Sequence, residues 1–98
     1  MKVTPRCREM LEFLVRPPED EDGELVRSGG EWWFGLEQTT WRVVKPAIVA
    51  GILRLVLEVG PDYEVYGPTP EVERVLADPE YETMLERALR TGEQQMGR

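Results

Sequence analysis

The sequence predicts a mainly α-helical domain with a small β-wing. Three observations favour this fold. Apolar residues recur at helical spacing near the start of the chain, a long apolar segment follows a proline in mid-chain, and a short aromatic segment lies beyond a Gly-Pro pair. A chain of 98 residues can bury one hydrophobic core, so we expect a single domain over residues 1–98.

The first helix is expected to begin at Pro5. The Thr4 side chain can cap the free amide groups, and proline fits the first helical position because its missing N–H has no partner there. One buried stripe comes next at helical spacing: Cys7, Met10, Leu11, Leu14 and Val15. Pro17 and Pro18 end the helix, and residues 17–24 form an acidic loop. The single cysteine, Cys7, is expected to be a buried helix residue.

Residues 25–36 allow two interpretations. In one, residues 25–27 and 31–36 form a hairpin around a turn at residues 28–30. In the other, residues 31–39 form a short helix that packs its aromatic side chains on the first helix. Periodicity cannot decide over so few residues; we favour the helix because a tight link and a second proline-started apolar segment come directly after it. Three tryptophans, Trp32, Trp33 and Trp41, cannot all be buried easily in a small domain, so one is expected at an edge or an interface.

The mid-chain apolar segment is expected to be a helix over residues 46–58. Pro46 begins it, and Gly60 and Pro61 end it. Most of its side chains are large and apolar. At about 100° per residue one narrow face remains open, and this face carries Ala47, Ala50, Gly51, Arg54 and Glu58. Small residues there would let another surface approach closely.

The last third of the chain predicts one strand and two helices. The strand covers residues 62–67. Thr69 and Pro70 then begin a helix whose residues Val72, Val75 and Leu76 face inward. Asp78 and Pro79 repeat the cap-and-proline signal, which indicates a final amphipathic helix over residues 78–91. Thr91 and Gly92 end this helix, and residues 92–98 are expected to be a frayed tail.

The composition excludes most catalytic and metal sites. Without histidine there is no Ser-His or Cys-His arrangement, and one cysteine excludes a Cys-rich zinc site. No phosphate-binding glycine motif occurs, and the acidic run at residues 19–24 lacks the spacing of a calcium loop. We expect no enzyme activity, no cofactor and no bound metal. The N-terminus lacks the apolar core of a signal peptide and no apolar run reaches ~20 residues, so a cytoplasmic protein without a membrane partner is expected.

Charge is unevenly distributed along the chain. Taken over the whole chain, the net charge is −7, and a charge of this sign repels phosphate groups. Glu37 and Glu58 nevertheless bracket twenty residues without an acid. This stretch carries Arg42, Lys45 and Arg54, and is the one long positive segment of the sequence.

Four segments together resemble a winged helix-turn-helix domain of the PadR-like kind. They are the apolar stripe from Leu11 to Leu14, WFGLE at 33–37, KPAIVAGILRLVLEVG at 45–60 and YEVYGPTPE at 63–71. The resemblance covers roughly residues 4–76. It implies that 33–39 is the second helix, that 46–58 is the recognition helix, and that 62–67 belongs to the wing. It also implies that Arg42 and Lys45 approach DNA while Ala47, Ala50 and Arg54 face the groove.

Two functions are therefore expected as alternatives. The first is a small regulator that binds DNA as a dimer through Arg42, Lys45, Ala47, Ala50 and Arg54. The second is an acidic protein-interaction module on the same frame that covers a basic protein surface, for example a phage-type inhibitor of a nucleic-acid-binding host protein. A homodimer whose seam is the helix over 79–91 is compatible with both.

Overall fold

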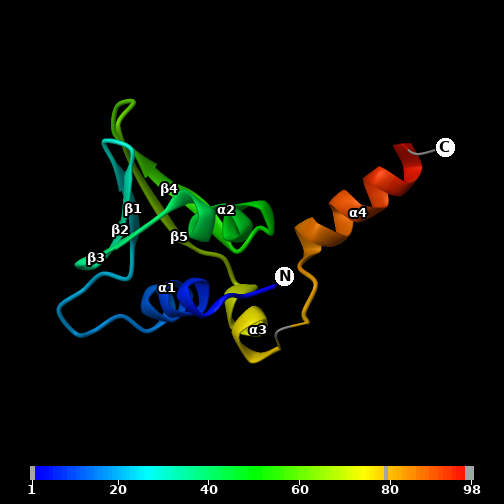
Figure 1. Cartoon of the computed structure of the whole chain (residues 1–98), viewed down its shortest axis with the longest axis horizontal. Helices are drawn as coiled ribbons and strands as arrows, with labels where there is room; N and C mark the ends of the chain where they lie inside the picture. The colour runs from blue at the N-terminus through cyan, green and yellow to red at the C-terminus, as the bar shows by residue number, and fades with distance from the viewer. Residues whose placement is uncertain (1, 79, 97–98) are drawn as a thin grey trace.

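The chain folds as a five-stranded antiparallel sheet with helices packed on one face (Figure 1). The structure is a computed structural model, and it describes residues 2–78 and 80–96. The elements are α1 (Pro5–Val15), β1 (Leu25–Ser28), β2 (Glu31–Phe34), β3 (Glu37–Thr39), α2 (Trp41–Val49), β4 (Leu53–Glu58), β5 (Tyr63–Pro68), α3 (Val72–Ala77) and α4 (Met84–Met96). The strand order is β3-β2-β1-β5-β4. The expected mainly α fold with a small β-wing is therefore wrong, because the protein is an α+β fold.

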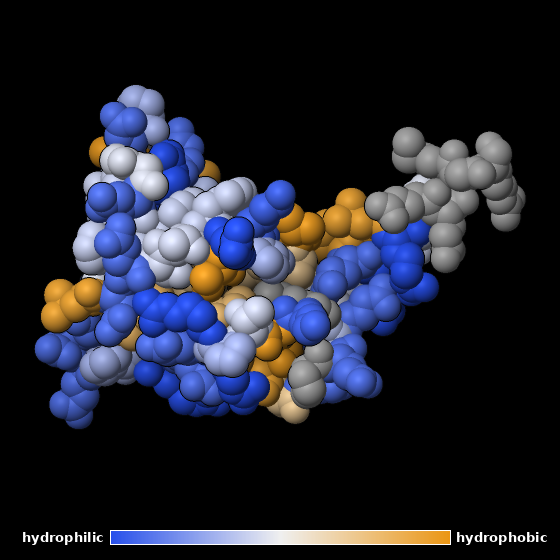
Figure 2. All heavy atoms as spheres, viewed as in Figure 1, coloured by the Kyte–Doolittle hydropathy of each residue, from blue (hydrophilic) through white to orange (hydrophobic). Residues whose placement is uncertain are grey.

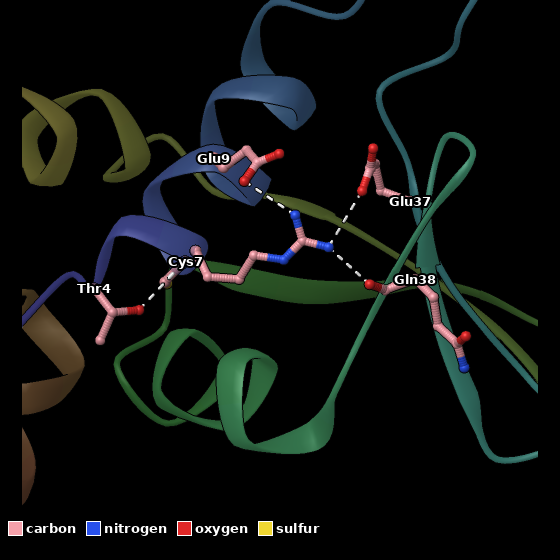
Figure 3. A network of polar contacts seen from close by, with 6 residues as sticks. Thr4, Cys7, Glu9, Glu37 and Gln38 are labelled. Atoms are coloured by element: carbon pink, nitrogen blue, oxygen red, sulfur yellow. Dashed lines mark hydrogen bonds and ion pairs between the residues drawn. The ribbon is translucent and has the colours of Figure 1, made fainter.

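The α1 helix forms as the sequence predicts. The Cys7 N–H donates to the Thr4 hydroxyl oxygen at 3.2 Å, which caps the helix. The side chains of Cys7, Met10, Leu11 and Leu14 are buried in the core. Arg6, beside this buried stripe, reaches β3, where its guanidinium donates to the Gln38 carbonyl oxygen at 2.7 Å and pairs with Glu37 at 3.4 Å (Figure 3). Packing and this tether together place α1 across the sheet.

The hairpin interpretation of residues 25–36 is confirmed, and the favoured helix over 31–39 is wrong. Gly29 and Gly30 both have positive φ, which suits the two-residue turn between β1 and β2. In β2 the side chains alternate, with Trp32 and Phe34 buried in the core and Trp33 on the opposite face. The tryptophan at an edge is Trp41, which is half-exposed and stacks on Trp32.

The expected helix over 46–58 is also wrong. Residues 41–49 are helical, but Gly51 adopts φ of 79°, a left-handed conformation that ends the helical path. The chain then turns, and the Thr69 hydroxyl and N–H hold this turn by donating to the carbonyl oxygens of Gly51 and Ile52, each at 2.7 Å. Leu53 to Glu58 continue as the edge strand β4.

The remaining elements match the sequence predictions more closely. The strand β5 matches the expected strand over 62–67, and the side chains of Val72, Val75 and Leu76 on α3 are buried as predicted. The expected final helix over 78–91 is displaced along the chain: Pro79 lies outside the described residues, and α4 begins at Met84. The expected helix end at Thr91 and Gly92 is wrong, because α4 continues past both residues to Met96. In the part of the chain that the structure describes, no helix is both long and apolar enough to cross a membrane.

Gly35 offers a direct test of this fold. It turns the chain between β2 and β3 at φ of 62°, and a Cβ atom there would lie 2.9 Å from the Phe13 ring. We expect Gly35→Ala to lower the free energy of unfolding by about 1–3 kcal/mol, because left-handed backbone strain adds to this clash. The measurement is urea denaturation followed by tryptophan fluorescence.

Gly92→Ala is the matched control for this experiment. Gly92 lies within α4, has no positive φ, and has open space where a Cβ would be. A change of Gly92 to alanine should leave the urea concentration at the midpoint of unfolding unchanged or raise it. Equal losses from both variants would contradict the turn geometry.

Candidate functional site: the outer face and open edge of the sheet

An apolar row crosses the sheet face that the helices leave uncovered. Val26 pairs with Trp33 on one side and with Val65 on the other, and Val65 pairs with Leu57. Directly opposed residues in antiparallel strands share a face, so these four side chains form one continuous row. Their neighbours Leu25, Phe34 and Leu53 lie on the opposite, inner face in the core. Val65 is only 4% exposed although it lies outside this core, so the row already buries its own centre.

The row ends at an open strand edge. The strand β4 has β5 on one side and no neighbouring strand on the other within the described residues. Its residues Val56 and Leu57 are 59% and 52% exposed. Val59 and Tyr63, at the turn between β4 and β5, are also exposed. We name this set the hairpin surface: Val56, Leu57, Val59 and Tyr63. Leu55, before the bulge, pairs with Tyr66 and lies on the inner face.

A bulge shapes the hairpin surface. The register between β4 and β5 shifts between Leu55 and Leu57, which makes Val56 an extra residue. Val56 packs over Gly67 of β5, where a Cβ atom would come within 3.1 Å of a Val56 methyl group. The absence of a side chain at Gly67 thus lets Val56 lie flat against the sheet, next to Leu57.

Two carboxylates flank one end of the hairpin surface. Asp62 belongs to the turn of the β4–β5 hairpin, and Glu31 begins β2. A third, Glu58, pairs with Glu64 and therefore lies on the opposite, inner face. The Gly29 N–H donates to the Asp62 carbonyl oxygen at 3.0 Å, which holds the β1–β2 turn beside the β4–β5 turn. Within the described ranges, none of the three carboxylates forms an ion pair. This end of the sheet is therefore apolar at its centre and negative at its rim.

The nearest arginine is already engaged on the inner face. Arg27 of β1 forms a short hydrogen-bonded ion pair with Glu64 of β5 and also donates to the Pro61 carbonyl oxygen at 3.1 Å. The Tyr66 hydroxyl donates to the same Glu64 carboxylate at 3.1 Å. The hydrogen bond from Arg27 lowers the pKa of Glu64. The pKa of Tyr66 is raised, mainly by burial and secondly by the hydrogen bond to the Glu64 carboxylate. The cluster fixes the hairpin to β1, and most of the Arg27 charge is spent on Glu64 rather than on the rim.

The residues predicted to bind DNA are dispersed. Ala47 and Ala50 are buried in the core, so they cannot face a groove. Arg42 and Lys45 are exposed one helical turn apart on α2. Arg54 is exposed on β4, where it follows the buried Leu53 and pairs with Gly67, and it therefore points to the outer face. Of the three predicted cations, Arg42 and Lys45 lie together on α2, whereas Arg54 lies apart from them on β4.

The sequence interpretation missed the hairpin surface. Its signal is the run LRLVLEV at 53–59, in which leucine alternates with other residues at strand spacing before Gly60 and Pro61. The same run continues directly from the apolar residues after Pro46, and this continuity favours a helix when the sequence is taken alone.

Comparisons of the chain with protein-family models, with curated proteins and with solved structures returned no match. The resemblance to PadR-like regulators therefore stays a prediction about the sequence. A proposal for the function therefore rests on the surfaces of the protein itself.

The Arg27–Glu64 pair predicts a pH dependence of stability. Because the folded-state pKa of Glu64 is lowered, the pair stabilises the fold above the unfolded pKa of about 4.3, and this contribution is lost as pH falls through the lower folded value. Glu64→Gln should thus destabilise the protein at pH 7, and its difference from the wild type should narrow below about pH 4. Urea denaturation across this pH range measures the free energy of unfolding of the variant and of the wild type.

Glu19→Gln provides the control, since Glu19 is exposed in the loop after α1 and forms no ion pair in the described part of the chain. It should change stability little at either end of the range. A constant difference between Glu64→Gln and the wild type at every pH would contradict the assigned ion pair.

Proposed function

We propose that the protein is an acidic interaction module that binds another protein through the hairpin surface. The proposed partner presents apolar side chains flanked by lysine or arginine. The observation that carries the proposal is the exposed apolar strand β4 at the open edge of the sheet, with an acidic rim beside it. Natural edge strands are usually shielded by charges, by bulges, by proline or by a covering element. The strand β4 has a bulge and the charges of Arg54 and Glu58, yet Val56 and Leu57 between them stay exposed.

Burial of the hairpin surface would supply most of the affinity. Fully burying one valine or leucine side chain stabilises a complex by about 1.5–3 kcal/mol, and Val56 and Leu57 each retain more than half of their exposure. The bulge at Val56 interrupts regular backbone pairing along this edge. We therefore expect side-chain contact, rather than continuous addition of a partner strand, to dominate the interface.

The charges select the partner. Glu31 and Asp62 flank the apolar centre, and the whole chain has a net charge of −7. Such a field accelerates encounter with basic proteins and repels polyanions. An acidic module of this kind would cover a basic protein surface, including one that otherwise contacts nucleic acid.

DNA binding is the second candidate. It is supported by Arg42 and Lys45, which are exposed on α2 and form no ion pair within the described residues. Two phosphate contacts are fewer than the roughly six to ten that give strong, salt-sensitive DNA binding. The candidate therefore needs further contacts, and we rank it below protein binding.

The decisive experiment places a photo-crosslinking amino acid at position 57, and at position 36 as the reference. Leu36 is 92% exposed but lies in the β2–β3 turn, outside the hairpin surface. We expect a crosslink from position 57 to a single basic protein in cells that naturally make this chain. The purified partner should then bind the wild type directly, and Leu57→Gln should weaken binding about tenfold, or about 1.4 kcal/mol, whereas Leu36→Gln should not.

Charge variants test the rim in the same binding assay. Glu31→Gln with Asp62→Asn should weaken binding and reduce its salt dependence, whereas Glu19→Gln with Glu80→Gln removes the same charge at a distance and should not. Equal crosslinking from positions 36 and 57 would contradict the proposal. So would salt-dependent binding to a random DNA duplex that Arg42→Gln with Lys45→Gln abolishes, and that result would establish the second candidate.

A further inference from the structure

The helix α4 leaves the body of the protein and projects from it (Figure 1). Its contacts with the body concentrate at its start. The buried Thr83 hydroxyl donates to the Ala50 carbonyl oxygen, the Met84 N–H donates to a Glu71 carboxylate oxygen at 2.8 Å, and Leu85 lies against Gly51. These contacts fix the origin of α4 and leave its later turns to be stabilised in another way.

One side of α4 is apolar and exposed. Met84 is 73% exposed, and Leu85, Ala88 and Leu89 are exposed with it at the spacing of one helix face. A helix of thirteen residues is marginal in water without tertiary packing. The exposed stripe therefore requires a surface against which to pack.

The chain also carries an open groove at this point. A cavity of about 530 Å³ lies between the first turns of α4 and the loop after β5, and its lining includes Gly51, Pro70 and Glu71 together with Met84, Leu85 and Ala88. Figure 2 shows apolar residues gathered where α4 leaves the body. The absence of a side chain at Gly51 lets Leu85 pack closely against the body, since a Cβ atom there would come within 3.1 Å of Leu85.

We propose that this groove and the apolar side of α4 form the contact between two copies of the chain, related by a two-fold axis. Each copy contributes its own α4 and its own groove, so a single two-fold contact buries the apolar side of α4 and the groove of both copies. In residues 84–92 the one acid, Glu86, is outnumbered by Arg87 and Arg90, so this segment does not carry the acidity of the whole chain.

The charges on the two sides of this contact are complementary. Glu71 lines the groove, where one of its oxygens accepts hydrogen bonds from the Met84 N–H and the Tyr81 hydroxyl, and Arg87 lies on α4, where it lines the adjoining hollow with Ala88 and Gly92. Arg87 forms no ion pair in the part of the chain described. Ala88 borders both cavities and lets a second helix approach closely. A basic partner of the kind proposed for the hairpin surface would find no comparable rim of acids along this segment.

The first test measures oligomeric state by sedimentation over about a hundredfold range of concentration. We expect a dimer that dissociates on dilution, with helical circular dichroism that falls as it dissociates. Ala88→Glu and Leu89→Gln should each shift the dissociation constant toward monomer by about tenfold or more. Leu36→Gln, at an exposed apolar residue outside α4, should leave it unchanged.

A disulfide test locates the contact. Ala88→Cys should form a crosslinked dimer under mild oxidation, whereas Leu36→Cys should not. The native thiol does not interfere, since Cys7 is buried and burial raises its pKa to about 11.

A wild-type chain that remains monomeric at every concentration would overturn the proposal. A dimer that survives Ala88→Glu but dissociates with Leu57→Gln would also overturn it, because the contact would then be the hairpin surface. The binding experiment on the hairpin surface is separate, so either proposal can fail without the other.

Discussion

The rest of the structure depends on the packing of α1 against the inner face of the sheet. Met10 and Leu11 are fully buried there, against the face that carries Leu25 and Phe34 on the two strands of the first hairpin. This contact brings together segments that are separated by the acidic loop. It also decides which face of every strand is inner, because side chains alternate along a strand and one choice of register settles the whole sheet. The outward direction of Val26 and Val65 is a consequence of that choice.

The helices α1 and α3 were predictable because signals within a few residues of the sequence specify them. Thr4 and Pro5 mark a helix start, and Val72 and Val75 follow a proline at helical spacing; these signals act within one or two turns. The middle of the chain was not predictable in the same way. Its apolar run satisfies a buried helix as well as a strand, and the decision falls at Gly51, whose positive φ reverses the chain. A single glycine inside a helical pattern is tolerated often enough that the sequence alone did not mark the break.

The candidate site lay further from prediction than the fold. Its apolar row needs Trp33, Val26, Val65 and Leu57 to align across four strands, and that alignment is a product of tertiary pairing. The acids and tyrosines of residues 62–67, by contrast, are local features, and the strand expected there is present. The predicted groove-facing alanines failed for the same physical reason that the site was missed. Ala47 and Ala50 are small because the core packs tightly around α2, so their size reflects burial rather than an open docking face.

The two proposed surfaces have different physical consequences because they lie far apart. The molecule extends 49 Å along its longest axis, with the β4–β5 hairpin toward one end and α4 toward the other (Figure 1). A dimer formed through α4 would leave both hairpin surfaces free and would present them on separate arms. Two such surfaces on one assembly raise the apparent affinity for a partner that is itself repeated, without any new contact at either surface. Under both proposals together, a partner that is itself repeated or oligomeric would be bound more tightly by the dimer than by a single chain.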